Sequence, residues 1–369
     1  MMGNWKTCQL GDLITFQRGH DLPKSKMKGG IYPVVGSNGI IGYHDEYTTE
    51  SPSITIGRSG NVGKPFLYKG RSWSHNTSLY IREYKDIDPI FIYYFLQTLD
   101  LGNYAGGSAV PTLNRNHIHT LTVTVPVDKN EQRQIASVLS VLDDKIEQNT
   151  EINENLLQQA QSIFIHEFLT IDSLPDGWQE SSLLGIADYL NGLAMQKYRP
   201  TDDEQGLPVL KIKELRQGSC DSNSELCSPS IKPEYIVHDG DVIFSWSGSL
   251  LVDLWCGGTC GLNQHLFKVT SSKYDKWFYY AWTNHHLVKF SAIAADMATT
   301  MGHIKREELA KAKVLIPSKS DYDRIGGLLA PLYNLVIANR TENRKLTTLR
   351  DELLPQLMSG QLDVSEVTL

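Results

Sequence analysis

The sequence of 369 residues has few cysteines and no long apolar run, and both shortages exclude whole classes of protein. Its five cysteines are an odd number without regular spacing, which argues against a disulfide framework and favours a reducing compartment. No apolar run approaches the ~18 residues of a membrane span, and the first ten residues lack a signal-peptide pattern. We therefore expect a cytoplasmic protein without a membrane partner.

Metal-binding motifs are also scarce. Cys220, Cys227, Cys256 and Cys260 could form a four-thiolate zinc site, but their gaps of six and three residues miss the usual ligand spacing. The sequence leaves metal binding by these cysteines open. We predict no metal ligands and no cofactor in this chain.

Motifs for catalysis are incomplete as well. Five residues, instead of four, separate Gly57 from Gly63-Lys64, and Pro65 stands where a phosphate-binding loop has the Ser or Thr that holds magnesium. Adenine methylation needs an Asn/Asp-Pro-Pro-aromatic loop for the flipped base. The nearest match, Asp88-Pro89-Ile90-Phe91, lacks the second proline and is expected to start a helix. We predict a non-enzymatic chain.

Positive charge is in short supply for a protein that binds nucleic acid, because the formal net charge is −7 at pH 7. Residues 1–128 hold 12 Lys and Arg against 10 Asp and Glu. The later segments, 129–169, 170–317 and 318–369, each hold more acidic than basic residues. Contacts with nucleic acid would therefore have to come from local patches or from partner subunits.

What the chain does contain is a seven-residue apolar repeat, which occurs twice about 190 residues apart. Such a repeat puts one stripe on a helix, as in the seam of a coiled coil. Two asparagines occupy equivalent places in both stripes, and a buried amide must find a partner, which fixes register. We predict that two long helices pair through Ile135, Leu139, Leu142, Ile146, Asn149, Asn153 and Leu156 in the first and Ile325, Leu329, Leu332, Val336, Asn339, Asn343 and Leu346 in the second.

The alternative for these helices is that each stripe packs only on its own neighbouring domain. The second helix also has Gly326, Gly327 and Pro331 in its opening turns, and we expect the proline to kink or delay it. Gly360 is expected to end the helix.

The segments that precede the two helices are related to each other. Trp5 and Gly19 correspond to Trp178 and Gly192 at one offset of 173, and residues 53–60 resemble residues 241–248. A self-similar period near 190 residues is too long for a solenoid and indicates a duplicated module. We predict an α+β protein with an internal repeat: two similar mixed α/β domains (1–128 and 170–317), two long helices (129–169 and 318–360) that pair as a coiled coil, and a tail (361–369).

Polar side chains in the predicted loops are the candidate contacts to DNA. Lysine and arginine contact phosphates, and arginine and asparagine also bind base edges. The second domain keeps the framework but changes these residues, since 58–61 becomes 246–249 and 75–77 becomes 262–264. The predicted DNA-binding residues are Lys24, Lys26, Lys28, Arg58, Ser59, Asn61, Lys64, His75, Asn76, Asn114, Arg115, Asn116, Trp246, Ser247, Ser249, Asn263, Gln264, Lys305 and Arg306.

Each of these segments also has a purely structural explanation. The lysines after Pro23 suit a solvated surface loop, and the glycine-rich segment suits a β-hairpin turn with incidental polar residues. Asn114 suits a helix cap. The sequence does not decide between these explanations.

In order and in duplication, these features resemble the specificity (S) subunit of type I restriction-modification systems. The resemblance covers essentially the whole chain and rests on the strand followed by Arg58-Ser-Gly-Asn-Val-Gly63, the helix start Asn130-Glu-Gln-Arg133, the paired asparagines, and the ending Leu349-Arg-Asp-Glu-Leu-Leu-Pro355. It implies a pseudo-two-fold internal repeat in which the two long helices pair as an antiparallel coiled coil. It also implies two target-recognition domains that each bind one half of a bipartite site on double-stranded DNA. It also implies helices that set an unread spacer, two methyltransferase (M) subunits that bind S-adenosylmethionine, and restriction (R) subunits for cleavage.

Two other functions are consistent with the sequence. The chain could be a stand-alone bipartite DNA-binding protein that acts without a methyltransferase. It could instead be a small-molecule enzyme whose glycine loops bind the substrate and whose helices form a dimerisation arm. Net acidity favours the enzyme, and the lack of a coherent catalytic constellation argues against it.

Overall fold

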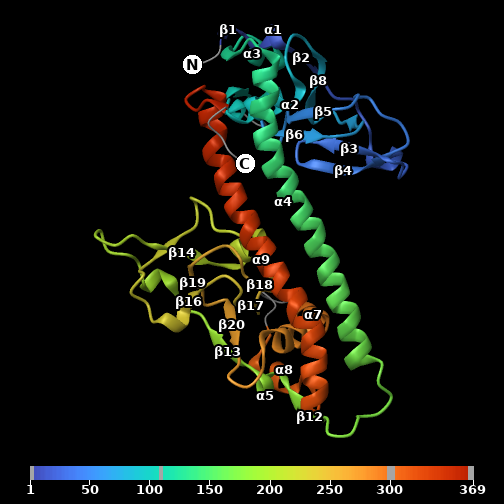
Figure 1. The fold of residues 1–369 in the computed structure, drawn as a ribbon, viewed down its shortest axis with the longest axis vertical. Coiled ribbons are helices and arrows are strands. Elements are labelled where there is room, and N and C mark those ends of the chain that lie inside the picture. Colours follow the sequence, from blue (N-terminus) through green and yellow to red (C-terminus); the bar gives the residue numbers. More distant parts are fainter. Residues whose placement is uncertain (1–3, 108–110, 297–303, 365–369) are drawn as a thin grey trace. The chain divides into compact units, whose positions relative to one another are not determined.

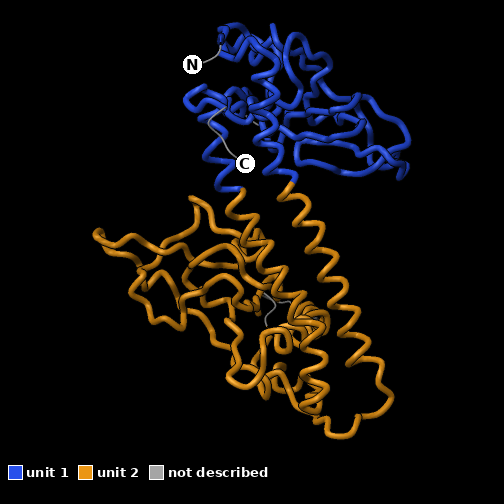
Figure 2. The backbone as a smooth tube through the Cα atoms, viewed as in Figure 1, with its two compact units in different colours: residues 1–144, 347–369 blue, residues 145–346 orange. Residues whose placement is uncertain are grey.

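The computed structural model describes residues 4–107, 111–296 and 304–364, so the predicted tail lies outside the described residues from 365 onwards. The chain divides into two compact units, which Figure 2 shows in different colours. Unit 1 comprises residues 1–144 and 347–369, and unit 2 comprises residues 145–346. Each unit contains one α/β body and one end of each of the two longest helices, α4 (Lys129–Phe164) and α9 (Lys319–Met358) (Figure 1).

The α/β body of unit 1 consists of short strands and short helices and precedes α4. Its elements are β1 (Trp5–Gln9), α1 (Leu10–Leu13), β2 (Ile14–Arg18), β3 (Tyr32–Gly36), β4 (Gly39–His44), β5 (Ser53–Gly57), β6 (Pro65–Tyr68), β7 (Trp73–Ser74), β8 (Ser78–Tyr84), α2 (Pro89–Gln97), β9 (Ala105–Gly106), β10 (Thr112–Leu113), α3 (Arg115–His119) and β11 (Thr122–Pro126). One sheet has the order β2-β8-β5-β6, a second has the order β4-β3-β7, and β1 pairs with β11.

Unit 2 repeats this plan before α9. Its elements are β12 (Gln179–Ser182), α5 (Leu183–Ile186), β13 (Asp188–Asn191), β14 (Leu207–Leu210), α6 (Ile212–Gln217), β15 (Leu226–Cys227), β16 (Ile236–Val237), β17 (Val242–Ser245), β18 (Leu251–Leu254), β19 (Cys260–Leu262), β20 (Leu266–Thr270), α7 (Lys276–Asp296), α8 (Arg306–Lys311) and β21 (Lys313–Ile316). The sheets are β13-β20-β17-β18 and β15-β14-β19-β16, and β12 pairs with β21. None of the described helices is long and apolar enough to cross a membrane.

The duplication extends to individual hydrogen bonds between each body and its helix. In unit 1 the indole Nε1 of Trp5 donates to Glu131 Oε1 at 3.2 Å, in the first turn of α4. In unit 2 the indole of Trp178 donates to Asp321 Oδ2 at 2.9 Å, in the first turn of α9. The two bodies therefore hold their following helices by equivalent contacts, and the predicted internal repeat is present in the fold.

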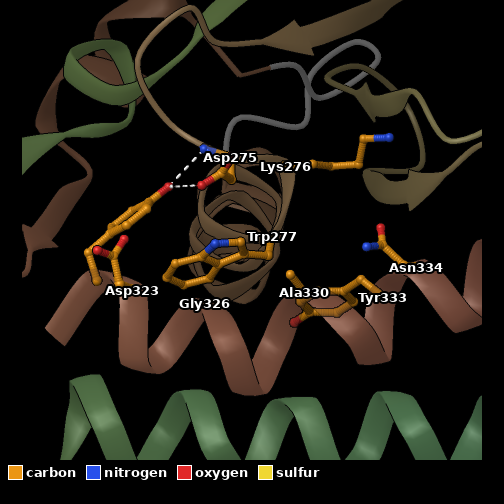
Figure 3. Close-up of a pocket in the computed structure, with 9 residues that line it drawn as sticks. Asp275, Lys276, Trp277, Asp323, Gly326, Ala330, Tyr333 and Asn334 are labelled. Carbon is orange, nitrogen blue, oxygen red and sulfur yellow. Dashed lines mark hydrogen bonds between the residues drawn. The ribbon is translucent and has the colours of Figure 1, made fainter. Parts of the chain in front are cut away.

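A second pair of equivalent contacts lies where α2 and α7 begin. The backbone N–H of Asp88 donates to Gln132 Oε1 at 2.8 Å, and the N–H of Asp275 donates to Tyr322 Oη at 2.8 Å. Burial raises the pKa of Tyr322, so its hydroxyl stays protonated and donates in turn to Asp275 Oδ2. Figure 3 shows the bonds of Asp275 at the edge of a cavity of about 410 Å³ that Trp277 also lines. We interpret this cavity as part of the joint between α7 and α9.

The two long helices pack as an antiparallel pair, as predicted, and their asparagines bond each other. Asn149 Nδ2 donates to Asn343 Oδ1 at 2.8 Å, and Asn339 Nδ2 donates to Asn153 Oδ1 at 3.0 Å. Asn153 and Asn339 are only 5% and 9% exposed. Satisfied amides in a buried seam fix which residues face each other, because any shifted register would leave them without partners.

The predicted seam residues do not all have the same partners. All of them are buried or half-buried. Ile135 and Leu139 belong to the core of unit 1, and Ile325 and Leu329 belong to the core of unit 2. The first turns of each helix thus pack into the preceding body, and the asparagine segment packs against the other helix.

Removing one amide of the Asn153–Asn339 pair should cost more than removing both. Asn153→Ala leaves the buried amide of Asn339 without its partner, which should lower the free energy of unfolding by about 1–3 kcal/mol. The double variant Asn153→Leu/Asn339→Leu replaces the pair with apolar groups of similar shape and should stay within about 1 kcal/mol of the wild type. Urea denaturation of both variants measures this difference, and equal losses would contradict the amide pairing.

Pro331 was predicted to kink or delay the second helix, and the predicted delay is wrong. Helix α9 begins at Lys319 and includes Pro331, although proline removes one hydrogen bond at a cost of about 3 kcal/mol. Buried side chains on both sides of the proline, Leu329 and Tyr333, pack in the core of unit 2 and offset this cost. The helix ends at Met358, and Gly360 takes a φ of 71° just beyond it, as predicted for a terminating glycine.

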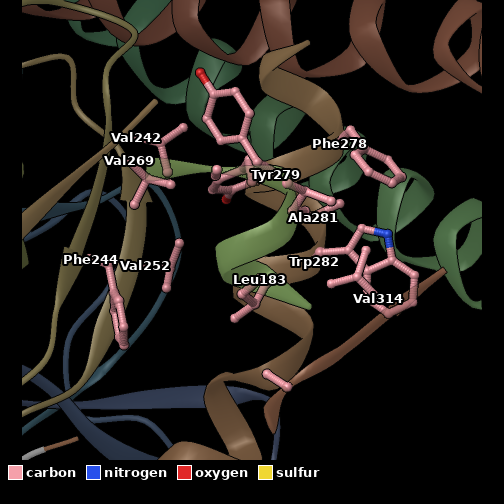
Figure 4. Close-up of a cluster of buried hydrophobic side chains, with 14 of the residues drawn as sticks. Leu183, Val242, Phe244, Val252, Val269, Phe278, Tyr279, Ala281, Trp282 and Val314 are labelled. Carbon is pink, nitrogen blue, oxygen red and sulfur yellow. The ribbon is translucent and has the colours of Figure 1, made fainter. Parts of the chain in front are cut away.

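The core of unit 2 lies between its main sheet and α7 (Figure 4). Phe244 of β17 is fully buried, and its ring centroid lies 6.0 Å from that of Phe290 on α7. Val252 and Val269 on the flanking strands complete the sheet side of the cluster. This packing fixes the end of β17, from which the candidate site of unit 2 extends.

Candidate nucleic-acid interface

The candidate site of unit 1 is centred on the connection between β5 and β6, residues 58–64, which we name hairpin loop 1. Its base is closed by the N–H of Gly57 donating to the Lys64 carbonyl at 3.1 Å and the N–H of Gly63 donating to the Gly57 carbonyl at 2.8 Å. A Cβ atom on Gly57 would overlap the carbonyl oxygen of Asn61, so only glycine fits there. The backbone is therefore a β-hairpin, with Asn61 and Lys64 exposed and Arg58 half-buried.

Two distant segments meet hairpin loop 1. The N–H of Arg58 donates to the Thr77 carbonyl at 2.8 Å, and the Arg58 carbonyl accepts from the N–H of Leu113 at 2.9 Å. The first bond places the predicted residues 75–77 beside the loop, and the second places residues 114–116 there. The structure thus brings together three of the four predicted segments of the first domain.

The third segment is the start of α3. Asn114 caps this helix, since its Oδ1 accepts from the N–H of Asn116 at 3.0 Å, so the structural explanation for Asn114 holds. Arg115 and Asn116 are exposed. At the other end, burial, with smaller contributions from Arg115 and Lys85, lowers the pKa of His119. Its neutral Nε2 accepts from the N–H of Phe16 at 3.0 Å and fixes α3 against β2.

The predicted basic loop, residues 24–28, lies elsewhere. Its lysines are exposed, and Lys28 Nζ lies 3.5 Å from Asp45, just beyond the end of β4. Strands β3 and β4 pair from Tyr32–His44 to Gly36–Gly39, and only their turn, Ser37-Asn38, approaches hairpin loop 1. Five residues of strand separate the two ends by roughly 16 Å, so Lys28 is not part of the same cluster.

Sequence analysis did not select the Ser37-Asn38 turn as a binding element. The N–H of Ser37 donates to Thr77 Oγ1 at 3.3 Å, and Asn38 is exposed. A Cβ atom on Gly60 would lie 3.1 Å from Ser37 Oγ, so the turn lies against the tip of hairpin loop 1. The turn itself was predictable, but its position depends on the parallel pairing of β3 with β7.

Unit 2 assembles the same cluster around residues 246–250, which we name hairpin loop 2. The Trp246 carbonyl accepts from the N–H of Ile304 at 2.9 Å, and Ser247 Oγ lies 3.2 Å from His265 Nδ1. The first bond places Lys305 and Arg306 beside the loop. Both are exposed, and Arg306 Nη1 also donates to the Tyr189 carbonyl at 3.3 Å.

The sequence comparison paired residues 75–77 with residues 262–264, and the structure shifts this pairing by one residue. His20 bridges to His75 in unit 1, and Leu193 bridges to Asn263 in unit 2, in the same parallel arrangement. His75 therefore corresponds to Asn263 and not to Leu262, and Asn76 corresponds to Gln264. Asn263 is buried and supports the turn, whereas Gln264 is half-buried.

Cysteine thiols make none of the contacts described above for the two clusters. Burial raises the pKa of the Cys256 thiol to about 11, which keeps it protonated. Cys260 of β19 is buried in an apolar cluster, and Cys220 packs against the same cluster. Within the described ranges, no three His, Cys, Asp or Glu residues are grouped so that they could hold a metal ion.

Fold and site together define a class: a duplicated recognition protein in which two related α/β units each gather exposed polar segments around a hairpin loop, with one pair of long helices. The chain belongs to the family of type I restriction modification DNA specificity domains, whose model matches residues 2–158 and 175–348. The two matched segments are the two halves of the internal repeat.

Curated relatives agree with this assignment, and a solved structure shares the fold. The chain is 24% identical to the type I restriction enzyme MjaIX specificity subunit of Methanocaldococcus jannaschii over 303 residues, 75% of this chain and 70% of that protein. It is 26% identical to the type I restriction enzyme EcoBI specificity subunit of Escherichia coli over 198 residues, 52% of this chain and 40% of that protein. The crystal structure of the type I restriction-modification system S subunit from M. genitalium shares the fold, with a TM-score of 0.63 and 17% identity over 96% of each chain.

Proposed function

We propose that this chain is the DNA sequence-specificity subunit of a type I restriction-modification complex, in which each unit binds one half of a bipartite target. The observation that carries the proposal is the same cluster built twice with different side chains. Arg58 of hairpin loop 1 is replaced by Trp246 in hairpin loop 2, and His75 is replaced by Asn263. One framework with two sets of exposed residues suits two half-sites of different sequence.

The residues around each hairpin loop suit contacts with double-stranded DNA. In unit 1, Arg58 and Arg115 offer guanidinium groups, and Asn61 and Asn116 offer amides, which are the side chains that pair with guanine and adenine edges. In unit 2, the side chains suited to base edges are Lys305, Arg306 and Gln264. Trp246 offers an aromatic face. Lys24, Lys26 and Lys28 suit phosphate contacts away from the loop.

Catalysis belongs to partner subunits in this proposal. Two methyltransferase subunits would bind S-adenosylmethionine and modify the target, and restriction subunits would cleave DNA. The internal duplication supports two copies of one partner, because it offers equivalent surfaces twice. The net charge of −7 supports the same conclusion, since a subunit of this charge needs partners to supply positive surface along the DNA.

The paired helices would set the spacer between the half-sites. Inserting one heptad into both α4 and α9 preserves the seam and adds about 10 Å of helix, or roughly three base pairs of B-DNA. We expect the recognised target to gain spacer length while both half-sites stay the same, as mapped by the methylated sequences of cells that contain the complex. Changed half-sites with an unchanged spacer would contradict this role. A heptad inserted into α9 alone breaks the seam and serves as the control.

A further inference from the structure

The two units differ in one element beside their hairpin loops. The Val35 carbonyl of β3 accepts from the N–H of His75 at 2.8 Å, and the Leu210 carbonyl of β14 accepts from the N–H of Asn263 at 3.2 Å, so these two strands are equivalent. After β3 the chain makes the two-residue turn into β4. After β14 it forms the helix α6 instead. Unit 2 therefore presents a helix where unit 1 presents a turn.

Both elements lie against the tip of the hairpin loop. In unit 1, Ser37 lies next to Gly60. In unit 2, a Cβ atom on Gly248, which occupies the place of Gly60, would lie 3.8 Å from Ile212 Cδ1 of α6. One turn further along this helix, Arg216 Nη1 donates to Ser249 Oγ of hairpin loop 2 at 3.3 Å. Helix α6 is thus hydrogen-bonded to the loop through Arg216, and Ile212 lies near the loop tip.

Arg216 differs from the other cations of this segment in its partners. Lys211 Nζ lies 2.6 Å from Glu225, and Lys213 Nζ lies 3.2 Å from Asp221, so both are ion-paired. Arg216 is exposed, and in the part of the chain that the structure describes no carboxylate lies within ion-pair distance of its guanidinium. A guanidinium has five N–H donors, so the bond to a neutral serine orients the group and leaves donors for a ligand.

We infer that Arg216 is a specificity-determining residue of unit 2, whose guanidinium donates to O6 and N7 of a guanine in the major groove. A planar fork on a rigid helix matches this pair of acceptors, which is the commonest base-specific contact of arginine. The inference deepens the proposed function and rests on it. Ser249, selected from the sequence as a DNA contact, acts here by orienting Arg216.

The test uses the chain in complex with its methyltransferase subunits and compares Arg216→Ala, Arg216→Lys and wild type. Preference for the correct base at one position of one half-site should fall at least about tenfold in Arg216→Ala, with the other half-site and the spacer unchanged. Arg216→Lys keeps the charge but loses the fork, so it should lose the same preference and retain overall DNA affinity within a few fold. Lys213→Ala, on the same helix but ion-paired, should leave the target unchanged.

Three results would overturn the inference. An unchanged target in Arg216→Ala shows that the residue makes no base contact. A uniform loss of affinity with an unchanged base preference shows a phosphate contact. Lost preference in Arg216→Ala with full preference in Arg216→Lys shows that charge alone suffices. A wild-type complex without a bipartite target would instead refute the proposed function, and that outcome is recognised before any variant is compared.

Discussion

Gly19→Ala is expected to remove the half-site bound by unit 1 and leave the half-site bound by unit 2. A Cβ atom on Gly19 would overlap the carbonyl oxygens of Ser74 and His75, which are backbone atoms that cannot rotate away. The chain after β2 must then move away from Ser74 and His75. The hydrogen bond from the N–H of His20 to the Ser74 carbonyl, 2.7 Å long, breaks as a result. Overpacking of this kind costs about 1–3 kcal/mol or more and displaces residues 75–77 beside hairpin loop 1.

The internal repeat provides an equivalent variant in unit 2 for this prediction. Gly192 stands in the same relation to Asn263, so Gly192→Ala should remove only the other half-site. Gly70→Ala is the control in unit 1, because nothing lies within 4 Å of a Cβ atom there. The methylated targets of the three variants report the outcome. Loss of both half-sites together in either glycine variant would show that the two units do not bind independently.

Phe244→Ala should lower the free energy of unfolding of unit 2 by about 3–5 kcal/mol, which is a larger loss than that expected for the asparagine or glycine variants. The side chain is 0% exposed, and its ring centroid lies about 6 Å from those of Phe267 and Phe290. No neighbour can fill the space that the ring leaves, because the surrounding side chains are held by both the sheet and α7 (Figure 4). Urea denaturation measures the loss.

Val288→Ala in the same unit is the control for Phe244→Ala. Val288 is 80% exposed, so its replacement should change the free energy of unfolding by less than about 0.5 kcal/mol. A loss below 1 kcal/mol for Phe244→Ala would contradict a core centred on β17 and α7. Because Trp246 lies two residues beyond Phe244, a destabilised core should also weaken binding by hairpin loop 2.

The long helices were predictable because their signal is local and repeated. The spacing of Asn149 and Asn153 matches that of Asn339 and Asn343, so each amide of one helix can meet an amide of the other. The fold class could also be predicted, because equivalent residues such as Trp5 and Trp178 recur at a constant offset. Pro331 was misleading because local helix propensity is weaker than the packing of the side chains around it.

The candidate site was only partly predictable, since its assembly depends on strand pairing between distant residues. The one-residue error at His75 arose because matching Asn76 with Asn263 and Leu79 with Leu266 shifts the comparison by one position. Only the bridges from His20 to His75 and from Leu193 to Asn263 give the structural correspondence. Arg216 was missed for a related reason: α6 reaches hairpin loop 2 only because β14 pairs in parallel with β19.

The central claim is that this chain alone selects the target of its complex. The most direct measurement is a base-resolution map of N6-methyladenine in cells that contain the partner methyltransferase with and without this chain. The account predicts a two-part motif with an unread gap that appears only when the chain is present. Methylation at the same sites in its absence would contradict the account and would leave a stand-alone DNA-binding role.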